Sequence, residues 1–128
     1  MQEKDLFEYA VIRVVPKVER EEFMNVGVIL YCARQKFLEA KCQLDEKRLQ
    51  AIYGKELDLE EIRNNLSAVE RISLGKDTGG PIAHLDPASR FRWLTATRST
   101  VVQTSKVHPG FCEKAAETLQ RLFQQLVL

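Results

Sequence analysis

The sequence predicts a single α+β domain, residues 1–128, in which a mostly antiparallel sheet of about four strands carries helices packed on it. Stretches rich in β-branched and aromatic residues come first along the chain. Stretches with apolar residues at helical spacing follow them. A chain of 128 residues with 45% hydrophobic composition can also bury one core without disulfides or a metal.

The first expected strand covers residues 8–15, EYAVIRVV, and stops at Pro16, which cannot donate to a strand ladder. Alternation places Arg13 on the same face as Tyr9. Arg13 is a cation in an otherwise apolar strand, which is typical of a side chain whose stem packs while its head reaches solvent. If this strand pairs antiparallel with the next one, Arg13 and Asn25 come near each other.

Two more strands are expected next. Residues 25–33, NVGVILYCA, are almost continuously apolar, which indicates a central strand covered on both faces. Gly27 in its middle implies that another group approaches the backbone closely, and alternation puts Asn25 on the face of Gly27. Residues 37–44, FLEAKCQL, alternate between apolar and polar side chains, as expected of a half-exposed strand at or near an edge.

Helix signals dominate the middle of the chain. Asp45 is expected to cap a short helix that ends at Tyr53. Asp58 is expected to start the clearest helix, which Gly75 ends. The following residues, 75–84, contain two adjacent glycines before a proline and form either a plain connection or a lid over the segment that comes next.

The last third is expected to contain two helices around one strand. Residues 87–96 follow an aspartate cap and read as a helix with Phe91 and Leu94 inward, although RFRWL also alternates as a strand would. Residues 99–105 read as a strand by their Thr and Val content. Residues 111–128 read as an amphipathic helix. Its expected inward residues are Ala115, Ala116, Leu119, Leu122, Phe123 and Leu126.

The segment from Arg90 to Gly110 gathers the groups that an anion site needs. It lies in a run from Pro87 to Cys112 that contains no Asp or Glu. Guanidinium forks and hydroxyls bind phosphate or carboxylate, so this segment is the predicted ligand site. The alternative is that its arginines pair with acids from elsewhere in the chain. The candidate donors are Arg90, Arg92, Arg98, Ser99, Thr100, Gln103, Lys106 and His108.

Catalysis and nucleic-acid binding are the competing functions. Histidine is a common acid or base in catalysis, so His108 could serve as acid or base on a phosphate-containing substrate, but the segment offers no carboxylate to orient it. No G-x-S-x-G, H-E-x-x-H or phosphate-loop motif is present. Trp93 is expected in the core rather than stacked on a base. Nucleic-acid binding is not favoured, since the net charge is only +1.

The cysteines indicate a reducing compartment. Cys32, Cys42 and Cys112 are odd in number, far apart and without a C-x-x-C pair, so neither a disulfide framework nor a zinc site is predicted. No cofactor is expected either. The polar first residues do not resemble a signal peptide, and no apolar run approaches the ~18 residues needed to span a bilayer. The expected location is the cytoplasm.

Three motifs are spread over most of the chain: Y-x-x-I-R-x-x-P in residues 9–16, E-x-x-N-V-G-V in residues 22–28, and RFRWLTA-x-RST-V-V-Q-x-S-x-VH-x-G in residues 90–110. They resemble the bacterial family catalogued as domain of unknown function 3037. The resemblance implies a short bacterial protein with a HipA-like kinase as partner, and it adds Arg13, Asn25 and Gly27 to the positions of interest.

We therefore hypothesise a non-enzymatic accessory or binding module. It would present the surface from Arg90 to His108 to a phosphorylated ligand or to a protein partner, such as a HipA-like kinase.

Overall fold

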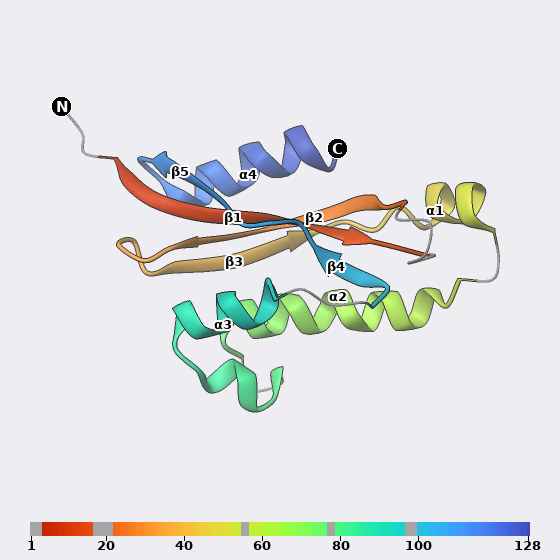
Figure 1. Cartoon of the computed structure of the whole chain (residues 1–128), viewed down its shortest axis with the longest axis horizontal. Helices are drawn as coiled ribbons and strands as arrows, with labels where there is room; N and C mark the ends of the chain where they lie inside the picture. The colour runs from red at the N-terminus through yellow and green to blue at the C-terminus, as the bar shows by residue number, and fades with distance from the viewer. Residues whose placement is uncertain (1–3, 17–21, 55–56, 77–78, 97–99) are drawn as a thin grey trace.

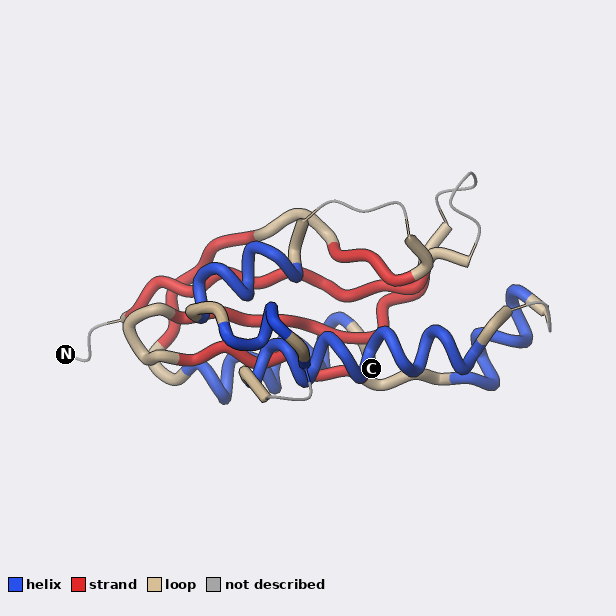
Figure 2. Tube along the Cα trace, turned by 90° about the horizontal axis from the view of Figure 1, so that it is seen from below, coloured by secondary structure: helices blue, strands red, loops and turns tan. Residues whose placement is uncertain are grey.

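The protein consists of one antiparallel sheet with helices on both faces (Figure 1). The computed structural model describes residues 4–16, 22–54, 57–76, 79–96 and 100–128. The strands and the long helices run along the long axis of the molecule (Figure 2). The α+β class is confirmed. The elements are β1 (Asp5–Val14), β2 (Met24–Cys32), β3 (Phe37–Cys42), α1 (Glu46–Tyr53), α2 (Leu59–Leu74), the 3₁₀ helix η3 (Pro81–His84), α3 (Pro87–Leu94), β4 (Val102–Thr104), β5 (His108–Cys112) and α4 (Ala115–Leu126).

The sheet has the order β3-β2-β1-β4, and β5 also pairs with β1. All of these pairs are antiparallel. Strands β4 and β5 pair with different parts of β1, β4 with residues 12–14 and β5 with residues 5–9. Ser105 joins the two parts, because its backbone N–H donates to the Val11 carbonyl at 2.8 Å and its Oγ accepts from the Val11 N–H at 2.8 Å. The five strands therefore occupy four positions across the sheet, because β4 and β5 share the position next to β1.

Each face of the sheet has its own hydrophobic core. On one face, Ile12 and Ile29 pack with α2 and with Phe91 of α3, whose ring centroid lies 5.5 Å from that of Tyr31. On the other face, residues such as Leu30 of β2 pack with α4. Because β1 and β2 contribute to both cores, β2 is the central, doubly covered strand that its apolar run predicts.

The helix boundaries follow the capping signals of the sequence. Asp45, Asp58 and Asp86 each accept a hydrogen bond from the backbone N–H three residues later, at 3.0 to 3.1 Å. Gly75 ends α2 in the left-handed conformation at φ 71°. Asp and Gly satisfy the groups that a helix leaves unpaired at its two ends. The three predicted helices that these aspartates begin are thus confirmed, including the helical form of RFRWL.

Strand β3 is an edge strand whose outer side is covered by α2. The hydroxyl of the buried Ser73 accepts a hydrogen bond from the Ala40 N–H at 3.2 Å and donates to the Glu70 carbonyl at 2.8 Å. One outward donor of the edge is therefore satisfied by a helix side chain instead of by water.

Two expectations for the C-terminal part are wrong. Residues 108–112 form the fifth strand, so the last helix begins at Ala115 and not at Phe111. Within α4, Ala116 is exposed and Thr118 is buried in its place. No helix in the part of the chain that the structure describes is long and apolar enough to cross a membrane.

Candidate functional site

Three polar residues lie side by side across β2, β1 and β4. Arg13 of β1 is opposite Asn25 of β2 on one side and opposite Gln103 of β4 on the other. Residues directly opposite in antiparallel strands have Cβ atoms about 4.5–5.5 Å apart and project to the same face. Here that face carries α4, because Asn25 Nδ2 donates to the Leu126 carbonyl at 3.1 Å. The predicted closeness of Arg13 and Asn25 is confirmed.

A β-bulge brings Asn25 to this face. Ile12 pairs with Gly27, whereas the next residue, Arg13, pairs with Asn25, so Val26 is the extra residue in β2. Simple alternation predicts that Asn25 shares the face of Gly27. That prediction is wrong, because the bulge shifts the alternation of β2 by one residue.

The guanidinium of Arg13 is half-buried and has no acidic partner among the described residues. Its Cζ lies 3.8 Å from the centroid of the Phe23 ring, and its Nε is buried without a hydrogen-bond partner. The ion pairs between described residues involve Arg34, Arg63 and Lys114 instead. Burial lowers the pKa of Arg13 from its ordinary value, because the charged form loses water. An anion placed beside Arg13 would offset this loss.

Asn25 and Gln103 supply the polar groups next to Arg13. The Oδ1 of Asn25 is buried and accepts no hydrogen bond from a described residue, so a donor that reached it would satisfy a buried acceptor. Gln103 Nε2 donates to the Thr100 carbonyl at 2.8 Å, and the Thr100 hydroxyl donates to the Val102 carbonyl at 2.7 Å. These two bonds hold the turn before β4, so the predicted donors Thr100 and Gln103 are partly engaged within the protein.

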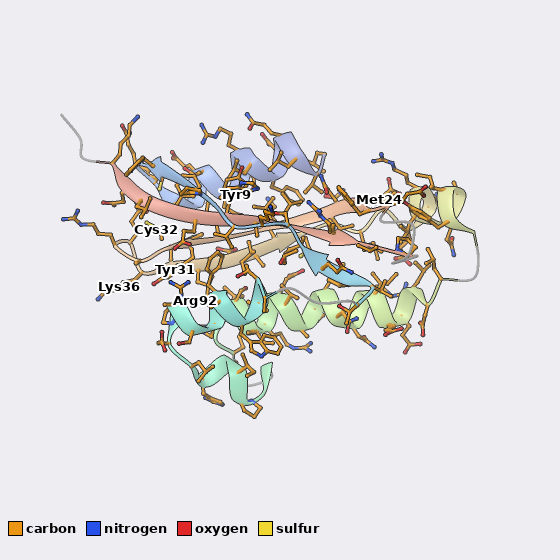
Figure 3. The ribbon with its side chains drawn as sticks, viewed as in Figure 1. Tyr9, Met24, Tyr31, Cys32, Lys36 and Arg92 are labelled. Carbon is orange, nitrogen blue, oxygen red and sulfur yellow. The ribbon has the colours of Figure 1, made fainter. Side chains whose placement is uncertain are left out.

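The arginines of α3 lie away from this row. Arg90 Nη1 donates to the carbonyls of Ile72 and Ser73 at 3.2 Å each, at the C-terminal end of α2. Arg92 is exposed on α3, on the opposite side of the sheet from Tyr9 of the Arg13 face (Figure 3). The structure therefore does not bring Arg90 or Arg92 together with Arg13.

Replacing Arg90 by methionine should lower the free energy of unfolding by about 1–2 kcal/mol, because two charge-assisted hydrogen bonds to the end of α2 are lost. Arg92→Met in the same helix is the matched control and should change it by less than about 0.5 kcal/mol, since Arg92 is exposed. Urea denaturation followed by circular dichroism measures both values. Equal stabilities of the two variants would contradict the structural role of Arg90.

His108 is exposed on β5 and pairs with Tyr9, whose ring centroid lies 5.3 Å from that of the imidazole. Tyr9 is four residues from Arg13 along β1, about 13 Å at about 3.3 Å per residue. His108 therefore does not share a phosphate-sized ligand with Arg13. The predicted site residues Arg98 and Ser99 lie outside the described residues. Trp93 is 39% exposed, so its expected place in the core is wrong.

A comparison with known families identifies the chain. The family model described as "Protein of unknown function (DUF3037)" matches residues 9–127. The chain belongs to the DUF3037 family. No curated protein and no solved structure matches it. The matched span of this DUF3037 protein includes every candidate site residue named above.

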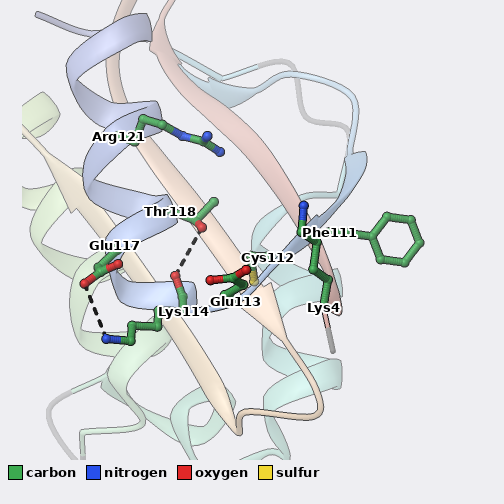
Figure 4. Close-up of a pocket in the computed structure, with 8 residues that line it drawn as sticks. All are labelled: Lys4, Phe111, Cys112, Glu113, Lys114, Glu117, Thr118 and Arg121. Atoms are coloured by element: carbon green, nitrogen blue, oxygen red, sulfur yellow. Dashed lines mark hydrogen bonds and ion pairs between the residues drawn. The ribbon is translucent and has the colours of Figure 1, made fainter. Parts of the chain in front are cut away.

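One pocket of the DUF3037 protein, of about 290 Å³, lies between β5 and the first turns of α4 (Figure 4). Lys4, Lys114 and Arg121 line it together with Glu113 and Glu117, so charges of both signs are present. Lys114 and Glu117 already form an ion pair at 3.8 Å. The mixed charges do not favour an anion. In the sequence, the helical spacing of Lys114, Glu117 and Arg121 indicates that these charged side chains lie close together.

A second pocket of about 350 Å³ adjoins the Arg13 row. Its lining includes Phe23 just before β2, Asn25 within β2, Arg48 and Ile52 from α1, and Leu126 from α4. Sequence reasoning does not find this pocket, because its walls come from three separate elements. Its one local signal is Phe23, an aromatic residue in a charged segment, which is 46% exposed.

The cysteines of the DUF3037 protein are buried or half-buried free thiols. Burial, reinforced by Glu70, raises the pKa of Cys42 to about 12, so its nucleophilic thiolate form is scarce at neutral pH. Within the described residues, no group of three or more His, Cys, Asp or Glu side chains is placed to hold a metal ion.

Proposed function

We propose that this DUF3037 protein is a binding module in which Arg13 receives the anionic group of a phosphorylated ligand or partner. The observation that supports the proposal is the half-buried Arg13 guanidinium, whose Nε has no hydrogen-bond partner and which pairs with no described acid. A buried charge without a partner costs stability. A bound anion would provide the missing partner.

The geometry around Arg13 suits a phosphoryl group. A guanidinium presents its donors in one plane and can bind two oxygens of the same phosphate. Contact with the Phe23 ring restricts the orientation of that plane. A guanidinium held in this way would lose less side-chain freedom on binding a ligand.

The neighbours of Arg13 favour binding over catalysis. Asn25 and Gln103 carry amides and Phe23 carries an aromatic ring, and none of these groups titrates near neutral pH. A general acid or base must reach the reacting group directly or through one water molecule. His108 pairs with Tyr9, which is about 13 Å from Arg13 along β1, so it does not meet that condition for a ligand held at Arg13.

A phosphorylated protein is one source of such a group, and a small phosphate ester is the other. The resemblance of the sequence motifs implies a HipA-like kinase as the protein partner, and this remains a prediction. Both sources present the same tetrahedral oxyanion to Arg13, so inorganic phosphate is a suitable first probe.

Titration of the protein with inorganic phosphate at low ionic strength tests the proposal. We expect Arg13→Met to weaken phosphate binding at least tenfold, because charge-assisted hydrogen bonds are lost. The measurement is the shift of amide resonances in nuclear magnetic resonance spectra, which also report whether the variant is folded. Arg92→Met, a cation removed from the other side of the sheet, should leave the affinity within twofold.

Asn25→Asp provides a second variant that keeps Arg13. It places a carboxylate opposite the guanidinium and should abolish phosphate binding by occupying it. Unchanged affinity in both Arg13→Met and Asn25→Asp would overturn the proposal. If the partner is a HipA-like kinase, the protein should capture the phosphorylated kinase and the unphosphorylated kinase to different extents. Arg13→Met should remove that difference.

A further inference from the structure

The pocket of about 350 Å³ beside Arg13 is larger than an isolated phosphate needs. It lies within the range of about 300–1,000 Å³ that small-molecule sites occupy. Two of its lining residues, Phe23 and Asn25, are also the immediate neighbours of Arg13. Arg13 itself does not line the pocket, so Phe23 and Asn25 are the residues that connect the anion site to it.

The wall of this pocket carries exposed apolar side chains from different elements. Phe23 before β2 is 46% exposed and Ile52 of α1 is 56% exposed. Tyr53 and Leu126 line the same space. Apolar side chains that converge on a cavity from separate elements gain free energy when a ligand covers them. Such a wall suits the organic part of a ligand and not a bare ion.

The polar groups of the pocket define what else the ligand carries. Asn25 lines the pocket and its buried Oδ1 accepts no hydrogen bond, so a turn of this side chain toward the pocket would let a ligand N–H or O–H satisfy it. Arg48 adds a second cation at the pocket, and its side chain forms no ion pair with a described residue. A ligand that carries a hydrogen-bond donor, an anionic group and an apolar body would therefore match the groups around this pocket.

We propose that the ligand is an organic phosphate monoester with an aromatic or aliphatic body and an adjacent N–H or O–H donor. Its phosphoryl group lies at Arg13, its body contacts Phe23 and Ile52, and its donor bonds to Asn25 Oδ1. This inference rests on the proposed function and specifies the chemical class of ligand that the site binds.

Three probes separate the parts of this inference: inorganic phosphate, phenyl phosphate and N-acetyl-O-phosphotyrosine amide. Phenyl phosphate should bind about tenfold more tightly than inorganic phosphate, which corresponds to covering about 60 Å² of apolar surface at about 25 cal/mol per Å². The phosphotyrosine amide adds N–H donors and should bind more tightly again. Calorimetry or amide-resonance shifts measure all three affinities.

Ile52→Ser should remove most of the gain of phenyl phosphate and leave the affinity for inorganic phosphate unchanged. Leu74→Ser, at a residue of α2 that is 50% exposed and does not line this pocket, is the matched control and should change neither affinity. If phosphate binds through Arg13 but phenyl phosphate binds no more tightly, the inference fails and the proposed function stands. If the affinity for neither probe depends on Arg13, the inference and the proposed function both fail.

Discussion

Replacing Phe91 by alanine should lower the free energy of unfolding by about 3–5 kcal/mol. Phe91 is 2% exposed and is the largest of the fully buried side chains in the described part of the chain. Its ring lies against Tyr31 of β2, so together with the buried Leu94 it attaches α3 to the sheet. Truncation removes the transfer energy of the ring and leaves a cavity that the backbone of α3 cannot fill.

The measurement is urea denaturation followed by the circular dichroism of the helices. Arg92→Ala, one residue further along the same helix and exposed, is the control and should change the stability by less than about 0.5 kcal/mol. A loss below about 1 kcal/mol for Phe91→Ala would show that α3 is not held to the sheet in the way described.

Gly27→Ala should lower the free energy of unfolding by about 1–3 kcal/mol, because the added methyl group overpacks the sheet. An added Cβ at this position would lie 2.7 Å from the Lys41 carbonyl oxygen and 2.8 Å from the Cys42 Sγ of the neighbouring β3. Real Cβ atoms do not approach other atoms so closely, so β2 and β3 would have to separate locally. Thermal and urea denaturation of the variant measure the cost.

A second substitution identifies which atom causes the destabilisation by Gly27→Ala. Cys42→Ala removes the Sγ atom, so the double variant Gly27→Ala, Cys42→Ala should be less destabilised than the sum of the two single variants. Complete additivity would show that the sulfur does not contribute to the clash, and that the Lys41 carbonyl alone opposes the methyl group.

Local signals predict most of the fold. Caps such as Asp45 and Asp58 act within one helical turn, and the apolar run of β2 reports burial on both faces, so these elements follow from neighbouring residues alone. The strand at residues 108–112 does not follow in this way, because Pro109 and Gly110 are typical of turns. An outer strand tolerates proline, since its free side needs no donor.

The candidate site is only half predictable, for two physical reasons. Arg13 stands out as a cation among apolar residues, but its contact with Asn25 depends on a bulge that alternation does not encode. The acid-free stretch also suggests that Arg90 is free for a ligand. Its partners are backbone carbonyls at the end of α2, and a count of acidic residues does not include them.

The hydrogen bond between Ser73 and the Ala40 N–H has a consequence for the behaviour of the protein in concentrated solution. Fibrillar aggregates grow when a foreign strand finds a row of unoccupied donors and acceptors along a sheet margin. At β3 the Ala40 N–H is already bonded to Ser73, and α2 covers this edge. We therefore expect the margin formed by β3 to resist intermolecular strand addition as long as α2 remains folded.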